Sequence, residues 1–142
     1  MAGRTYRYMK SNILFPFGFG LSYTSFAYSG ARVVDSLATK GRVTVSTSVA
    51  NTGDRDGDEV VQLYISHTKP GVEAPLVELK GFKRIHLAKG ESARVSFEMP
   101  AEAFQLVDAQ GRWFMPKDDV DIFFGRDSRT PASKSLTVKL AK

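Results

Sequence analysis

Residues 43–66 constrain the fold most, because side chains alternate at a period of two on both sides of a polar loop. Such alternation is typical of β-strands that have one buried and one solvent-facing side. Residues 51–58 between them are rich in Asn, Asp and Gly, which favour turns. The stretch therefore predicts an antiparallel pair of strands, 42–50 and 59–66, within an all-β domain. The expected inward positions are Val43, Val45, Thr47 and Val49, then Val61, Leu63 and Ile65, with Thr44, Ser46 and Ser48 facing solvent.

Further strands are expected along the rest of the chain. Residues 24–34, 79–87, 92–99, 120–124 and 136–140 read as strands, and residues 107–115 read as a hairpin turning at 108–111. In the 79–87 strand, Phe82, Ile85 and Leu87 are expected to point inward. Residues 35–41 and 67–78 read as loops, and Pro100 is expected to begin one short helical turn. About seven short strands with turn signals between them predict an antiparallel β-sandwich over residues 24–142.

The first 23 residues differ from the rest in composition. Pro16, Gly18 and Gly20 interrupt an aromatic stretch, which excludes a regular helix and disfavours a central strand. Residues 1–23 are therefore expected to form a linker and an irregular aromatic arm that packs on this domain or on a neighbouring one.

Composition narrows the function classes. The net charge is +5, but Lys and Arg are scattered, so no nucleic-acid partner is expected. No cysteine is present, and no stretch approaches the roughly 20 apolar residues of a membrane helix, so no membrane partner is expected. The N-terminus lacks the apolar core of a signal peptide, so the chain as written is expected to be cytoplasmic. A periplasmic or secreted parent enzyme is left open.

Several motifs together resemble one family. They are GRTYRY at residues 3–8, LFPFGFGLSYT at 14–24, VANTG at 49–53, GDEVVQLY at 57–64, LKGF at 79–82 and KGE at 89–91. In this order and spacing the chain resembles the C-terminal fibronectin type III-like domain of family 3 glycoside hydrolases, which include β-glucosidases and β-xylosidases. The resemblance covers nearly the whole chain and implies an immunoglobulin-like sandwich.

The resemblance also implies that catalytic residues lie elsewhere. The family's nucleophile is an aspartate of a Ser-Asp-Trp-like motif in a barrel domain, and its acid/base is usually a carboxylate of the next domain. The only tryptophan here, Trp113, follows Arg112, so this motif is absent. The expected function is that of a non-catalytic accessory domain that stabilises catalytic domains in cis and shapes the substrate entrance. The alternatives are a stand-alone carbohydrate-binding module and a part of a β-glucosidase active only when joined to its barrel.

Polar candidates for chemistry are few. Asp54, Asp56, Asp58 and Glu59 could present oxygens to Ca²⁺, but Ile65 stands where an EF-hand has its distal Glu, so a solvated turn is expected. Asp118, Asp119 and Asp121 are expected to lead into a hairpin, and His67 and His86 to be surface residues. No catalytic residue, metal site or cofactor is therefore predicted.

Aromatic residues are the better candidates for binding. Tyr6, Tyr8, Phe15, Phe17 and Phe19 are predicted to dock against a neighbouring domain. A second set, Trp113 and Phe114, could stack on a sugar ring, although Trp113 and Tyr64 are rather expected in the sandwich core. Whether the 67–78 loop reaches the substrate is left open.

Overall fold

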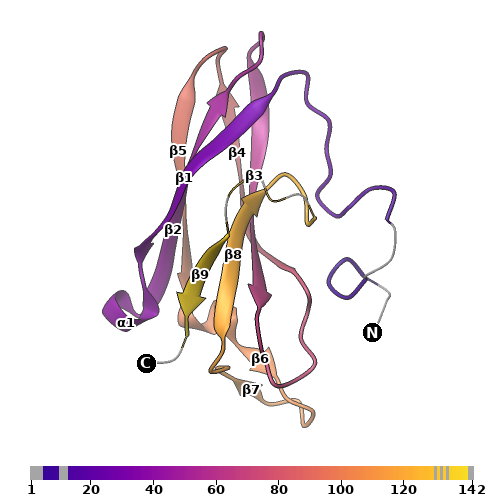
Figure 1. The fold of residues 1–142 in the computed structure, drawn as a ribbon, viewed down its shortest axis with the longest axis vertical. Coiled ribbons are helices and arrows are strands. Elements are labelled where there is room, and N and C mark those ends of the chain that lie inside the picture. The colour runs from indigo at the N-terminus through magenta and orange to yellow at the C-terminus, as the bar shows by residue number, and fades with distance from the viewer. Residues whose placement is uncertain (1–4, 10–12, 130, 132, 134, 141–142) are drawn as a thin grey trace.

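The computed structural model describes residues 5–9, 13–129, 131, 133 and 135–140. Two antiparallel sheets pack face to face as a β-sandwich (Figure 1). The described residues contribute seven strands to the two sheets, as predicted. The first sheet has the order β1-β2-β5 and the second β4-β3-β8-β9. Their bounds are β1 (Phe26–Asp35), β2 (Arg42–Asn51), β5 (Ser92–Pro100), β4 (Glu78–Leu87), β3 (Gly57–His67), β8 (Asp119–Gly125) and β9 (Leu136–Lys139).

Short elements close one end of the sandwich (Figure 1). The predicted turn at Pro100 is the 3₁₀ helix η1 (Ala101–Phe104), and the predicted hairpin is β6 (Leu106–Val107) paired with β7 (Trp113–Phe114). The loop expected at 35–41 contains the short helix α1 (Leu37–Lys40), which ends at Gly41 in the left-handed conformation. Among the described residues, no helix is long and apolar enough to cross a membrane.

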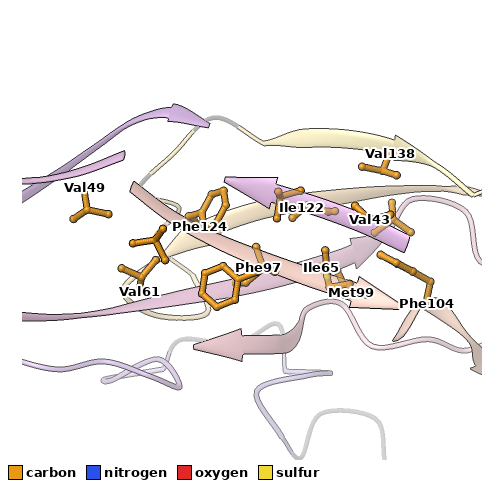
Figure 2. Packing of buried hydrophobic residues seen from close by; sticks show 14 of the residues in the cluster. Val43, Val49, Val61, Ile65, Phe97, Met99, Phe104, Ile122, Phe124 and Val138 are labelled. Carbon is orange, nitrogen blue, oxygen red and sulfur yellow. The ribbon is translucent and has the colours of Figure 1, made fainter. Parts of the chain in front are cut away.

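The core lies between the sheets and follows the predicted alternation. All seven inward positions predicted on β2 and β3 are at most 1% exposed. Phe97 of β5 and Phe124 of β8 meet between the sheets, with ring centroids 6.1 Å apart (Figure 2). Full burial of each large apolar side chain contributes about 1.5–3 kcal/mol. The apolar faces of β2 and β3 therefore fix which sides of the two sheets meet.

Two details of the predicted pattern are wrong. Thr44 and Ser46 are buried rather than wet, because they lie on the central strand of their sheet, where β1 and β5 shield short side chains. Phe82 is 67% exposed rather than inward. The β3–β4 pairing shifts register at Leu63, and Gly81 takes the inward place, where an added Cβ would lie 2.9 Å from the Phe97 ring. A side chain at 81 would collide with the core, so Phe82 faces outward.

Candidate functional site

The corner where the arm enters β1 is built around Asn51. Its side-chain amide donates to the Arg55 and Leu87 carbonyls at 2.7 and 3.0 Å, and its oxygen accepts from Thr24 Oγ1 and the Gly53 N–H. One buried side chain therefore links the end of the arm, the 51–57 turn and the end of β4. The small residue at 53 is required, since a Cβ there would lie 2.8 Å from the backbone nitrogen of Ser25, just before β1.

Residues 17 and 18 of the arm lie against the outer face of the β4-β3-β8-β9 sheet, and two polar side chains of β3 hold them. Gln62 Nε2 donates to the Gly18 carbonyl at 3.0 Å and to the Arg126 carbonyl at 2.7 Å, while Tyr64 Oη donates to Gln62 Oε1. From the segment after β8, the Ser128 N–H donates to the Phe17 carbonyl at 2.8 Å. Figure 1 shows this segment and the arm on the same side of the sandwich. The arm backbone is thus fixed by the sheet.

Tyr64 is buried, as predicted, but it does not belong to the core between the sheets. It stacks on Phe123 with ring centroids 5.3 Å apart, on the outer face and beneath the arm. Burial raises the pKa of its hydroxyl above its ordinary value. Gly18 meets this pair with φ of 83°, and a Cβ there would lie 2.8 Å from Tyr64 Oη. The arm can approach so closely only because residue 18 has no side chain.

Apolar side chains project from the fixed arm toward solvent. Leu14, Leu21 and Tyr23 are each more than nine-tenths exposed, and Phe15 and Phe19 form a tilted pair with centroids 5.2 Å apart. Large exposed apolar surface on a soluble protein marks an interaction site. We call these five side chains the arm surface. An open pocket of about 580 Å³ adjoins it, between residues 18–25 and the start of β3.

A charged cluster closes the floor of this pocket. Arg126 Nε lies 3.1 Å from the carboxylate of Glu59, which is buried, and Tyr28 Oη donates to the same carboxylate at 2.7 Å. Burial and the neighbouring carboxylate raise the pKa of Tyr28. The Arg126 guanidinium also lies 5.9 Å from the Phe26 ring centroid. The cluster therefore ties β1 of one sheet to β3 of the other and to the segment directly after β8.

The start of the arm packs at the opposite end of the sheet, beside the predicted 67–78 loop. Tyr6 stacks on Phe17 with centroids 4.1 Å apart, and its hydroxyl oxygen accepts a long hydrogen bond from the Leu79 N–H. Arg7 pairs with Glu78, and its carbonyl accepts from the Leu76 N–H at 2.6 Å. Residues 6 and 7 thus join the arm to the loop and to β4.

The predicted binding aromatics are distributed over three places. Phe15 and Phe19 belong to the arm surface, and Phe17 stacks on Tyr6, while Tyr8 lines a separate pocket of about 350 Å³. The core position expected for Trp113 is wrong: the side chain is 69% exposed and lines the same pocket as Tyr8. It lies outside the sandwich because the two-residue strands β6 and β7 form a separate ribbon beyond the sheets. Its neighbour Phe114 is half-buried.

The surface position predicted for His67 is wrong as well. Its side chain is 3% exposed, and Nδ1 lies 3.2 Å from Asp118 Oδ1. Because His67 ends β3 beside the start of β8, the neighbouring strand covers it. His86 is exposed, and its Nδ1 lies 2.6 Å from Asp58.

The acidic loop residues point to different partners. Asp56 accepts from the Lys89 N–H, whereas Glu59 faces inward to Arg126. Hydrogen bonds from Arg84 and then His86 lower the pKa of Asp58. The Asp118 carboxylate contacts His67 Nδ1 and accepts a hydrogen bond from the Lys69 N–H, and Asp121 accepts one from the Thr137 hydroxyl. Within the described ranges no three acids or histidines gather as a metal site would require.

The residues that hold the arm were missed by sequence reasoning. Gln62 lies inside a recognised motif, but a lone polar residue on an outer strand face predicts only contact with water. Ser128 and Arg126 follow the predicted strand 120–124 and carry no local signal. A buried role for Gln62 could have been inferred only from its place on the same strand face as Tyr64, if the glycine-rich arm were known to cover that face.

Residues 59–128 match the fibronectin type III-like domain family. The chain therefore contains a fibronectin type III-like domain. It is 41% identical to a beta-xylosidase of Formosa agariphila over 94% of this chain and 19% of that protein. It is 38% identical to thermostable beta-glucosidase B of Acetivibrio thermocellus over 91% of this chain and 18% of that protein.

Solved structures agree with this fibronectin type III-like assignment. The Thermotoga neapolitana beta-glucosidase 3B complex with glucose superposes with a TM-score of 0.84 at 31% identity, over 96% of this chain and 19% of that one. The Bifidobacterium adolescentis GH3 beta-glucosidase superposes with a TM-score of 0.83 at 33% identity, over 94% and 20%. The chain therefore spans one fifth or less of these relatives. It corresponds to a part of family 3 glycosidases.

Proposed function

We propose that this fibronectin type III-like chain is a non-catalytic accessory domain of a family 3 β-glycosidase, and that its arm surface docks against the catalytic domains of the same polypeptide. One observation carries the proposal: the arm presents exposed apolar side chains on a backbone that Gln62 and Ser128 hold against the sheet. A backbone fixed in this way displays a surface that is organised before it meets a partner. The proposed partner of the arm surface is inferred from the relatives, in which four fifths or more of the protein lies outside the matched part.

The size of the apolar surface supports docking. Leu14, Phe15, Leu21 and Tyr23 keep most of their surface exposed, and burial of a large apolar side chain contributes about 1.5–3 kcal/mol. Complete burial of all four would therefore favour docking by roughly 6–12 kcal/mol before the costs of association. Within one polypeptide most of the association cost is already met by the covalent connection. A stable contact between domains is the expected result.

The finer parts of the proposal concern the parent enzyme. The relatives are named as xylosidases and glucosidases, so β-xylosides and β-glucosides are the expected substrate class of the whole enzyme. The 67–78 loop, held at its start by the His67–Asp118 pair, is the segment we expect to border the substrate entrance. The isolated chain is expected to hydrolyse neither class.

A graft tests the accessory role. In the Formosa agariphila beta-xylosidase, the matched part is replaced by this chain, and melting temperature and hydrolysis of an aryl-β-xyloside are measured. The grafted enzyme is expected to be folded and active. Changing Phe15, Phe19 and Leu21 together to Ser is expected to lower the melting temperature and the yield of active enzyme.

A matched control separates docking from general surface polarity. Phe82 and Val34 are exposed apolar residues outside the arm, so their change to Ser is expected to leave the graft unaffected. Equal behaviour of the arm and control variants would refute docking through the arm. Hydrolysis by the purified chain alone would refute the non-catalytic assignment.

A further inference from the structure

The pocket beside Trp113 has the size and position of a ligand site. Its volume of about 350 Å³ lies at the lower end of the range of small-molecule pockets, roughly 300–1,000 Å³. Four separate parts of the chain line it: the start of the arm, the 67–78 loop, the beginning of β4, and the region from η1 to β7. Its shape therefore depends on tertiary packing and on no single loop.

An exposed indole on a rigid support forms one side of the pocket. Trp113 pairs with Val107 in the β6–β7 ribbon. The turn between them is held by Asp108, whose carboxylate accepts the backbone N–H of Gln110 and of Arg112, each at 2.9 Å. A hydrogen-bonded turn of this kind fixes where the indole lies. The ring offers an apolar face and one N–H donor, an arrangement suited to a ligand that has both apolar and polar faces.

Unused hydrogen-bonding groups line the remaining sides. Arg7 pairs with Glu78, which also lies 3.1 Å from Lys80, but the buried Arg7 Nε has no partner in the described part of the chain. Glu73 and Glu102 also line the pocket, and none of the described residues donates to their carboxylates. The pocket thus offers free acceptors beside an aromatic face.

The carboxylates select against an anionic ligand. Glu73, Glu78 and Glu102 would repel an anion, and Arg7 and Lys80 are both paired with Glu78. A neutral ligand with many hydroxyl groups does not meet this repulsion. Its hydroxyls can donate to carboxylates, and its C–H face can cover the indole.

We propose that this pocket binds a short stretch of neutral sugar chain, with Trp113 stacking on a pyranose ring and Glu102 accepting from its hydroxyls. Only the choice of sugars to test rests on the proposed function. The site would hold a β-linked oligosaccharide on the accessory domain. Sugar binding and docking through the arm use different residues and can therefore fail separately.

The titration uses Trp113 as its own reporter, because the chain contains one tryptophan. The full chain is titrated with xylotetraose and cellotetraose, and with maltotetraose as an α-linked comparison, while indole fluorescence is recorded. A saturable change at millimolar or lower concentration is expected for at least one β-linked sugar. No saturable change with either β-linked sugar would overturn the proposal.

Variants then assign the binding to the pocket by calorimetry. Trp113→Ala is expected to weaken binding at least about tenfold, and Glu102→Gln about three- to tenfold. Phe82→Ala is the matched control, because Phe82 is an equally exposed aromatic that does not line the pocket, and it should bind as the original chain does.

Two results would count against a sugar site. Unchanged affinity in Trp113→Ala would place any binding elsewhere. A protein occupant would show itself in the grafted enzyme: if Trp113 fluorescence becomes shielded there and no sugar perturbs it, the pocket belongs to a domain interface. That second result would leave the docking proposal standing and overturn this one.

Discussion

Replacing Gly18 by Ala tests whether the arm is held by its close approach to β3. Residue 18 has φ of 83°, a conformation that costs an L-residue about 1–2 kcal/mol. The new Cβ would also lie 2.8 Å from Tyr64 Oη and 2.9 Å from Gln62 Cδ, so the Gln62 amide must move. Loss of its two hydrogen bonds to backbone carbonyls, at about 0.5–1 kcal/mol each, adds about 1–2 kcal/mol. The attached arm is therefore destabilised by about 2–4 kcal/mol in total.

This cost is expected to release the arm and leave the sandwich folded. The core between the sheets contains no arm residue among its buried members, so global unfolding in urea should change by less than about 1 kcal/mol. The amide of Ser128, which donates to the Phe17 carbonyl, reports on the release. Its hydrogen-exchange protection should fall roughly 30- to 1,000-fold, the equivalent of 2–4 kcal/mol.

Gly20→Ala is the matched control for this experiment. Gly20 lies two residues along the same arm, and an added Cβ would meet nothing within 4 Å. Its Ser128 protection should match that of the original chain. Equal protection in the Gly18 and Gly20 variants would refute the reasoning, because it would mean that the arm is not held through its contact with Gln62 and Tyr64.

Two further substitutions test the corner and the surface. Asn51→Ala should lower the free energy of unfolding in urea by about 2–4 kcal/mol, because it leaves buried backbone groups unpaired, whereas Asp54→Ala on the same exposed turn should have little effect. Asp58→Asn tests the pH dependence of stability. Arg84 and His86 lower the pKa of Asp58 in the folded state. The ionised Asp58 therefore stabilises the fold above its ordinary pKa of 3.8, and this stabilisation is lost as the pH falls below that value. Melting temperatures between pH 5 and pH 2 should therefore fall less steeply in Asp58→Asn, and identical slopes would contradict the assigned ion pairs.

Local pattern was enough to predict the sandwich itself. The alternation in β2 and β3 identified the inward residues, and Val43 and Val61 are fully buried as expected. The turn at Pro100 and the hairpin at 108–111 were also predicted, because turn residues act through their own backbone. The pattern was less useful for β4, where the phase depends on a register shift and on the Phe97 ring in the facing sheet.

By itself, then, the sequence determined the all-β class, the inward faces of the central strands and the irregular aromatic character of the arm. Tertiary structure alone decided that Gln62 would hold the arm, that His67 would be covered, and that Trp113 would stand outside the core beside a pocket. The physical reason is the separation of the interacting residues along the chain. Alternation and turn chemistry act between residues a few positions apart, whereas the partners of Gln62 lie at Gly18 and Arg126, far away in the chain. Packing of the folded chain brings these groups together, and no preference between neighbouring residues could predict this proximity.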